Sequence, residues 1–135
     1  MKKQIAHVEA FQTAFNRPVR KSPSLIPETD FQLRFDLMKE ENDEYIEACQ
    51  ANDIVGVADA LGDMLYILCG TLVEHGMQDK IEAIFDEIQA SNMSKLDENG
   101  KPIINGQNGV LDLSRPMGKV LKSINFKEPN LKQFI

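Results

Sequence analysis

Two acidic sequences decide the fold expected of this chain, EENDE at residues 40–44 and DALGD at residues 59–63. In each of them two acids stand three or four residues apart, so the pair projects from one face of a helix. Like charges stacked in this way repel one another unless a cation lies between them. We therefore expect two antiparallel helices that present these carboxylates to a metal ion. The four acids are Glu41, Glu44, Asp59 and Asp63.

The hydrophobic pattern predicts further helices around this pair. Apolar residues recur at helical spacing, and connections rich in Pro, Gly and Asn separate the runs. The expected helices are Lys2–Phe15, Thr29 or Asp30 to Gln50, Ile54–Glu74, and Gln78 or Asp79 to Ser91. Asn99-Gly100 is a strong turn signal and predicts a small hairpin. The expected fold class is all-α, a bundle of four to five helices with a short C-terminal β-hairpin or an extended tail.

The segment Ile54–Val73 carries charge on only two side chains, Asp59 and Asp63. Its length and apolarity raise the question of a membrane span, but the two aspartates and several small residues favour a buried bundle helix. Burying two ionised carboxylates without partners would be prohibitive in free energy, and a metal ion is the simplest partner. The alternative for the Glu-rich sequence is an ordinary solvated helix face.

Charge is divided unevenly along the chain, whose formal net charge is −6. Residues 31–90 contain fourteen acids and three bases, whereas residues 91–135 contain seven bases and four acids. This division suits a cation site beside an anion site. It does not suit a duplex-DNA binder, which would carry a basic stripe on its folded body. The alternative is that the lysine-rich end is only a solvated terminus.

The length of 135 residues predicts one domain. It divides into an N-terminal helix and loop (1–29), a metal-binding helical core (30–92), and a hairpin with a basic tail (93–135). Cys49 and Cys69 lie in expected helices, where both are expected to fill the core. Because nothing resembles a signal peptide, a reduced, cytoplasmic setting is expected.

Mg²⁺ is the metal that fits such a group of acids, and Mn²⁺ can substitute for it. Mg²⁺ takes oxygen ligands and usually keeps several waters and the phosphates of a substrate. An ion of this kind neutralises a polyphosphate and lowers the pKa of a bound water for attack. Glu40 adds a carboxylate that could act as a base or orient that water.

The acidic pattern resembles that of the all-α nucleoside triphosphate pyrophosphohydrolases, a superfamily that includes MazG, dimeric dUTPases and phosphoribosyl-ATP pyrophosphohydrolase. The likeness is closer to the MazG-like, phosphoribosyl-ATP pyrophosphohydrolase-like branch, and it covers residues 31–129. It rests on the sequences ADALGDMLY (58–66), GT (70–71), SNMSK (91–95) and GKVLK (118–122). The chain departs from the usual Glu-x-x-Asp motif at residue 60, where it has alanine and the acid is Asp59 instead.

The resemblance implies Mg²⁺-dependent cleavage between the α- and β-phosphates of a nucleotide, which releases pyrophosphate and a monophosphate. The metal ligands that it implies are Glu41, Glu44, Asp59 and Asp63, and the catalytic residues are Glu40 and Glu41. The substrate-binding residues that it implies are Tyr66, Asn92, Lys95, Lys119, Lys122 and Asn125. Tyr66 and Asn125 also have ordinary structural explanations, as a core residue and a turn residue.

The predicted function is that of a nucleoside triphosphate pyrophosphohydrolase acting on ribo- or deoxyribonucleotides, such as dUTP or a non-canonical nucleotide. The alternatives are a phosphoribosyl-ATP pyrophosphohydrolase and a non-catalytic, nucleotide-binding helical module. A homodimer or homotetramer is expected, because a lone bundle would expose part of an apolar face. Neither a nucleic acid nor a membrane is expected as a partner.

Overall fold

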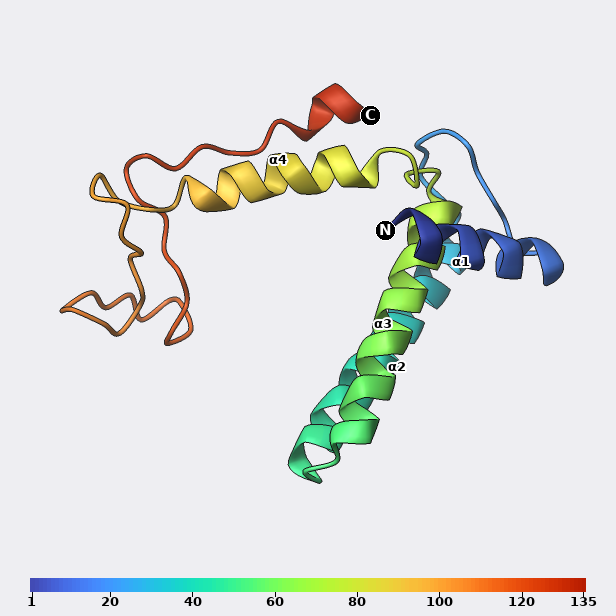
Figure 1. The fold of residues 1–135 in the computed structure, drawn as a ribbon, viewed down its shortest axis with the longest axis horizontal. Helices are drawn as coiled ribbons and strands as arrows, with labels where there is room; N and C mark the ends of the chain where they lie inside the picture. The colour runs from blue at the N-terminus through green and yellow to red at the C-terminus, as the bar shows by residue number, and fades with distance from the viewer. The chain divides into compact units, whose positions relative to one another are not determined.

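The computed structural model describes residues 1–135 and divides them into two compact units, Met1–Ile81 and Glu82–Ile135 (Figure 1). All regular elements are helical, which confirms the predicted all-α fold class. In chain order they are α1 (Lys2–Ala14), α2 (Glu28–Gln50), α3 (Ile54–Glu74), α4 (Ile81–Met93) and the short 3₁₀-helix η1 (Leu131–Phe134).

In the first unit α3 packs against both α1 and α2 (Figure 1). Its core is small and lies where α1 meets the last turns of α3. The core side chains are Ile5, Val8, Cys69 and Val73, with Val19 and Ile81 packed around them. Cys69 is fully buried, as predicted for a core residue. The same prediction for Cys49 is wrong, because its side chain is exposed near the end of α2.

Each of these three helices ends in a residue with left-handed backbone. These residues are Asn16 after α1, Asn52 after α2 and Gly76 after α3, with φ angles of 55°, 55° and 70°. In each case two successive amides donate back to carbonyl groups of the last turn, which is the Schellman arrangement. After α1 this arrangement includes the bond from the Arg17 amide to the Gln12 carbonyl, 2.7 Å long, and so fixes where Arg17 leaves the helix.

Helix α3 has the predicted bounds, and its two ends follow from local sequence. At its start the Asp53 side chain accepts hydrogen bonds from the amides of Val55 and Gly56, at 3.0 and 3.1 Å. At its end the chain turns at Gly76, where a Cβ atom would lie 2.1 Å from the Ser22 carbonyl oxygen. Only glycine therefore fits this turn.

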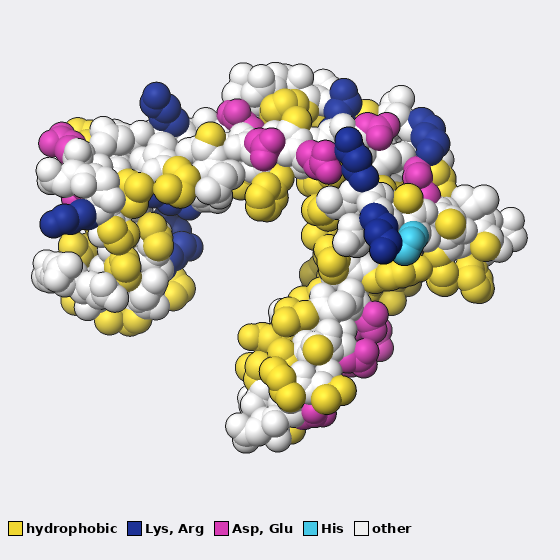
Figure 2. All heavy atoms as spheres, in the orientation of Figure 1, with side chains coloured by type: hydrophobic (Ala, Val, Ile, Leu, Met, Phe, Trp, Pro, Cys, Tyr) yellow, Lys and Arg dark blue, Asp and Glu magenta, His cyan; other side chains and the backbone are white.

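The hairpin of α2 and α3 leaves many large apolar side chains uncovered (Figure 2). Those on α2 and α3 include Phe31, Phe35, Ile46, Leu61, Leu65 and Leu68. By length and composition α3 is the one helix that could cross a membrane, yet it carries two aspartates. Only 17% of its most apolar window is buried within the chain. Exposed apolar areas of this extent are typical of surfaces that contact another molecule.

In the second unit the C-terminal segment runs back along α4 (Figure 1). Ser91 Oγ donates to the Lys127 carbonyl at 2.7 Å, and the Asn130 amide donates to Glu87 Oε1 at 2.8 Å. The predicted hairpin at Asn99-Gly100 is not formed. A turn does occur there, but the Asp97 side chain accepts the Asn99 and Lys101 amides and holds it without a strand ladder. The single bridge in this unit pairs Ile104 with Val120.

Asn105 organises the loop that follows. Its side chain is 1% exposed, and its Nδ2 donates to the carbonyl groups of Asp112, Arg115 and Pro116. Its Oδ1 accepts the Asp112 amide at 2.7 Å, and its backbone amide donates to the Lys119 carbonyl at 2.9 Å. One buried amide group therefore holds the 112–119 segment in place.

Replacing Asn105 by alanine is expected to loosen this segment, because the buried amide and carbonyl groups of the loop would lose their partner. An unsatisfied buried polar group costs about 1–3 kcal/mol. Hydrogen exchange should show the Asp112 amide exchanging at least ~10-fold faster in Asn105→Ala. The exposed neighbour variant Gln107→Ala is the control. Equal exchange in both variants would contradict this role for Asn105.

Candidate functional site

A cavity of about 270 Å³ lies between α1, α2 and α3 in the first unit. Its walls combine apolar, acidic and basic side chains. The lining residues are Val8, Phe11, Gln12, Arg17, Arg34, Leu37, Glu41, Asp63, Tyr66, Ile67 and Gly70. Arg34, Leu37 and Glu41 lie at helical spacing on one face of α2, which explains why they share this wall. Two predicted metal ligands, Glu41 and Asp63, are thus brought to one cavity.

Glu41 is the most perturbed acid in this cavity. Its Oε2 atom is buried and has no hydrogen-bond partner. Partial burial raises the pKa of its carboxyl group, and four other carboxylates raise that pKa further. In order of effect these belong to Glu44, Asp63, Glu40 and Asp59. The antiparallel helices therefore concentrate negative charge around one carboxylate, and a bound cation would relieve the repulsion.

The remaining acids are more open than predicted. Asp59 and Asp63 are both exposed, so the expectation that α3 buries two unpartnered carboxylates is wrong. The burial falls on Glu41 instead. Glu40 and Glu44 line a shallow groove on the outer face of α2, together with Asp36, Lys39, Asp43 and Glu47. No three acidic, His or Cys side chains lie close enough as placed to hold an ion. The assignment of the four metal ligands remains a prediction.

Tyr66 lines the cavity and contacts an aromatic group from α1. Its ring meets that of Phe11 edge-on, with centroids 5.6 Å apart, and Phe11 stacks on Phe15 at 4.3 Å. Tyr66 remains 40% exposed, so it forms part of the cavity wall and is not a core residue. An aromatic wall of this kind can contact a nucleobase through its face.

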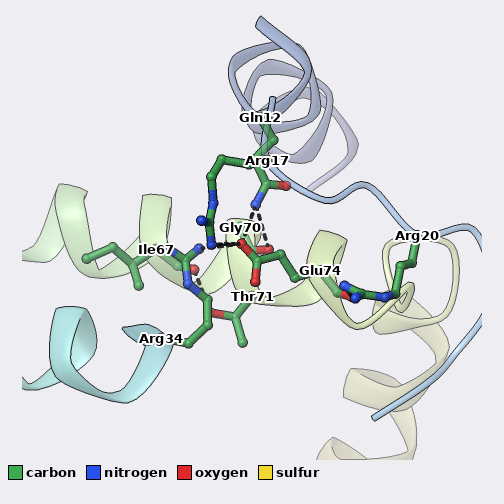
Figure 3. A network of polar contacts seen from close by, with 8 residues as sticks. All are labelled: Gln12, Arg17, Arg20, Arg34, Ile67, Gly70, Thr71 and Glu74. Carbon is green, nitrogen blue, oxygen red and sulfur yellow. Dashed lines mark hydrogen bonds and ion pairs between the residues drawn. The ribbon is translucent and has the colours of Figure 1, made fainter. Parts of the chain in front are cut away.

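A second polar group, which reaches the cavity through Gln12, Arg17 and Arg34, was not predicted from the sequence. Glu74, the last residue of α3, is fully buried, and its Oε1 accepts Gln12 Nε2 at 3.2 Å and Arg17 Nη2 at 3.1 Å (Figure 3). Arg34 Nη1 lies 3.7 Å from the same oxygen. Arg20 Nη1 donates to the Glu74 backbone carbonyl at 2.8 Å. Three elements therefore meet at one buried carboxylate.

Sequence reasoning missed this group because Glu74 is the last residue of an apolar helix, and a charged residue at a helix end is normally exposed. The only signal was that α2, which is mostly acidic, contains two bases, and only one of them, Lys39, has an acid at i+4 on the same helix to pair with, Asp43, whereas Arg34 does not. The pairing with Arg17 could not be read from spacing, because 57 positions separate the two residues.

The second unit contains a basic cavity of about 520 Å³. It brings together the three predicted lysines and one cation that was not predicted, Arg115, with a single acid, Asp112. The lining residues are Lys95, Asp112, Arg115, Lys119, Val120, Leu121 and Lys122. Hydrogen bonds from the Ser114 hydroxyl and amide, with a smaller effect of Arg115, lower the pKa of Asp112. Four cations against one carboxylate make this cavity suitable for an anion.

The other predicted residues of this unit have local partners. Asn92 Oδ1 accepts Lys95 Nζ at 2.7 Å, so the two side chains form one polar group at the end of α4. Lys122 pairs with Glu128 at 2.8 Å and lies 4.0 Å above the Phe126 ring. The Asn125 side chain is exposed and does not line the basic cavity. Its substrate role remains a prediction.

Comparison with protein families identifies the chain. Residues 8–92 match the family model described as phosphoribosyl-ATP pyrophosphohydrolase, which is more than half of its length. The chain belongs to this family. It is therefore a hydrolase, a pyrophosphohydrolase acting on a nucleotide phosphoanhydride. The matched part of this pyrophosphohydrolase includes Glu41, Asp63 and the Glu74 group, whereas Lys95, Lys119 and Lys122 lie outside it. A comparison with curated proteins finds no match.

Replacing Glu41 by glutamine is expected to stabilise the metal-free protein at neutral pH. The folded chain raises the pKa of this carboxyl group, so it holds the proton more tightly than the unfolded chain does. The protonated Glu41 contributes to the stability of the fold below about pH 4.3, the pKa of a free glutamate. This contribution is lost as the pH rises through the pKa of Glu41 in the folded chain. Glutamine mimics the protonated form.

Thermal unfolding in the presence of a chelator tests this prediction. Glu41→Gln should melt above the wild type at pH 7, and the difference should vanish below about pH 4. Glu47→Gln, which changes an exposed acid of the same helix, is the matched control. A wild type that is more stable than Glu41→Gln at pH 7 would contradict the repulsion inferred around this residue.

Proposed function

We propose that this pyrophosphohydrolase is Mg²⁺-dependent and cleaves the bond between the α- and β-phosphates of a nucleoside triphosphate, giving a monophosphate and pyrophosphate. The single observation that carries the proposal is Glu41. One of its oxygens is buried without a partner, four carboxylates raise its pKa, and it shares a cavity with Asp63. A carboxylate in this position needs a cation.

The chemistry of these side chains suits Mg²⁺, and the acids would have to move closer together to hold it. The donor set consists of carboxylate oxygens only, which Mg²⁺ prefers, and the site leaves room for waters and phosphate oxygens. Glu41, Glu44, Asp59 and Asp63 would hold the ion, and Mn²⁺ could replace it. When bound, the metal neutralises phosphate charge and lowers the pKa of a coordinated water.

The chain's own side chains supply the rest of the proposed site. Glu40 is adjacent to Glu41 and exposed, so its carboxylate is available to orient or deprotonate the attacking water. Tyr66 contacts the nucleotide from the cavity wall. Asn125 is proposed to contact the nucleotide as well.

The basic cavity of the second unit is proposed to bind polyphosphate. Lys95, Lys119 and Lys122 line it, and the Lys95 ammonium group is held by Asn92. Opposite charge on substrate and cavity favours this interaction, which salt should weaken. The polyphosphate bound there can belong to a substrate held by the acids of the same chain or of a neighbouring chain.

A homodimer or homotetramer is proposed because the hairpin of α2 and α3 exposes a long apolar surface. A second copy of the same hairpin offers a surface of matching chemistry, as expected in a symmetric homo-oligomer. A cytoplasmic location without nucleic-acid or membrane partners remains our expectation.

Two substrate classes are candidates. The first is dUTP or a non-canonical nucleotide, because the acidic cluster resembles that of the superfamily that includes MazG and dimeric dUTPases. The family match favours phosphoribosyl-ATP as the second. Both contain a triphosphate and need the same cleavage, and they differ in that phosphoribosyl-ATP carries an additional sugar phosphate.

Incubation with a panel of nucleoside triphosphates and phosphoribosyl-ATP in the presence of Mg²⁺ is expected to release pyrophosphate from at least one of them. Asp63→Asn should lower turnover at least ~10²-fold, because it removes a metal ligand, while the exposed side chain makes little contribution to folding. Asp79→Asn, at an exposed position outside the cavity, is the control. Product release that is independent of Mg²⁺, or unchanged in Asp63→Asn, would contradict the proposed site.

A further inference from the structure

The two arginines at Glu74 supply more positive charge than this buried carboxylate requires. Arg17 comes from the turn after α1 and Arg34 from α2, and both guanidinium groups converge on Glu74 Oε1 (Figure 3). One arginine would neutralise one carboxylate. Two leave a net positive charge at this end of the cavity, before any ligand is present.

The hydrogen-bonding capacity of Arg34 is largely unused. Its Nη1 lies 3.7 Å from Glu74 Oε1, which is an ion-pair distance and longer than a hydrogen bond. Its Nε is buried without any partner, and its side chain is only 13% exposed. A guanidinium group has five N–H donors in a fixed fork, so Arg34 keeps donors for an incoming anion.

The packing of α3 makes room for this guanidinium group. Gly70 lines the cavity, and a Cβ atom on it would lie 2.8 Å from Arg34 Nη1. The absence of a side chain at Gly70 therefore lets Arg34 lie directly on α3.

Arg17 and Arg34 line the same cavity as the acids Glu41 and Asp63. Along α2, Arg34 and Glu41 are seven positions apart, which corresponds to ~10 Å at 1.5 Å per residue. The cavity thus has a cationic end and an acidic end. A substrate whose reacting phosphates lie at the acidic end would contact the arginines with another group, ~10 Å away along the same molecule.

We propose that Arg17 and Arg34 form a phosphate-binding pair in this enzyme and that Glu74 is the positioning residue that holds them. The proposal rests on the proposed function, since the ligand is a phosphate group of the substrate. Arginine forks suit phosphate oxygens, which they bind through paired hydrogen bonds. The group can belong to the distal polyphosphate or to a remote sugar phosphate, and the two sources are separated by experiment.

Calorimetric titration of the full chain with inorganic pyrophosphate, and separately with ribose 5-phosphate, tests the pair directly, with Mg²⁺ present. Arg17→Gln and Arg34→Gln should each weaken at least one of the two ligands by ~10-fold or more, as expected for a charge-assisted hydrogen bond. A loss confined to pyrophosphate assigns the pair to the polyphosphate. A loss confined to ribose 5-phosphate assigns it to a sugar phosphate.

Arg20→Gln is the matched control, because Arg20 binds the Glu74 backbone but does not line the cavity. It should leave both affinities within ~2-fold. Gly70→Ala guards against loss of folding, since it displaces the Arg34 guanidinium group while alanine improves helix propensity. It should weaken the same ligand as Arg34→Gln in a chain whose thermal unfolding shows that it is folded at the titration temperature.

Unchanged affinities in Arg17→Gln, Arg34→Gln and Gly70→Ala would overturn the proposal, and so would an equal loss in Arg20→Gln. The nucleotide panel keeps this outcome separate from the proposed function. If the wild type releases pyrophosphate and the arginine variants keep their KM and kcat, the pair is purely structural and the function stands. If no nucleotide is cleaved, the proposed function itself fails.

Discussion

The first unit depends on one buried carboxylate. Glu74 has no exposed surface, and leaving it ionised without partners would cost more than the small apolar core could offset. Its partners come from α1, from the turn after α1 and from α2, so satisfying this charge requires all three to be placed correctly on α3. The Schellman turn that follows α1 sets the direction in which Arg17 leaves the helix, and Gly70 gives Arg34 its space. Local backbone chemistry and a distant ion pair thus specify the same arrangement.

The same arrangement gives the cavity its polarity. Because α2 and α3 are antiparallel, the end of α3 that holds Glu74 faces the beginning of α2 that holds Arg34, while Asp63 acts on Glu41 further along both helices. Arg17 and Arg34 share the carboxylate of Glu74, whereas the charges that act on Glu41 are all negative. The repulsion that raises the pKa of Glu41 therefore lowers the stability of the folded state, and a bound cation would remove it. Destabilising repulsion of this kind is common where a site is arranged for function and not for stability.

Much of the fold could be predicted from sequence, because its determinants are local. Helical periodicity, the Asp53 cap and the Gly76 turn each depend on a few neighbouring residues, and the structure confirms the predicted bounds of α3. The hairpin prediction was wrong because a turn signal says nothing about strand pairing, and the backbone and side chain of Asp97 together satisfy that turn. The Glu74 group and Arg115 were missed because they depend on tertiary placement. The spacing of the acids predicted which side chains would share charge, but not that Glu41 would be the one among them that is partly buried.

We propose that Glu41 and Asp63 hold a divalent cation at the acidic end of the cavity that they share. Mn²⁺ binding measured by electron paramagnetic resonance tests it most directly, because free and bound Mn²⁺ are counted without any need for turnover. We expect the wild type to bind Mn²⁺ and Glu41→Gln and Asp63→Asn each to weaken binding by at least ~10-fold, while Glu47→Gln binds as the wild type does. Equal Mn²⁺ affinity in the wild type, Glu41→Gln and Asp63→Asn would contradict it.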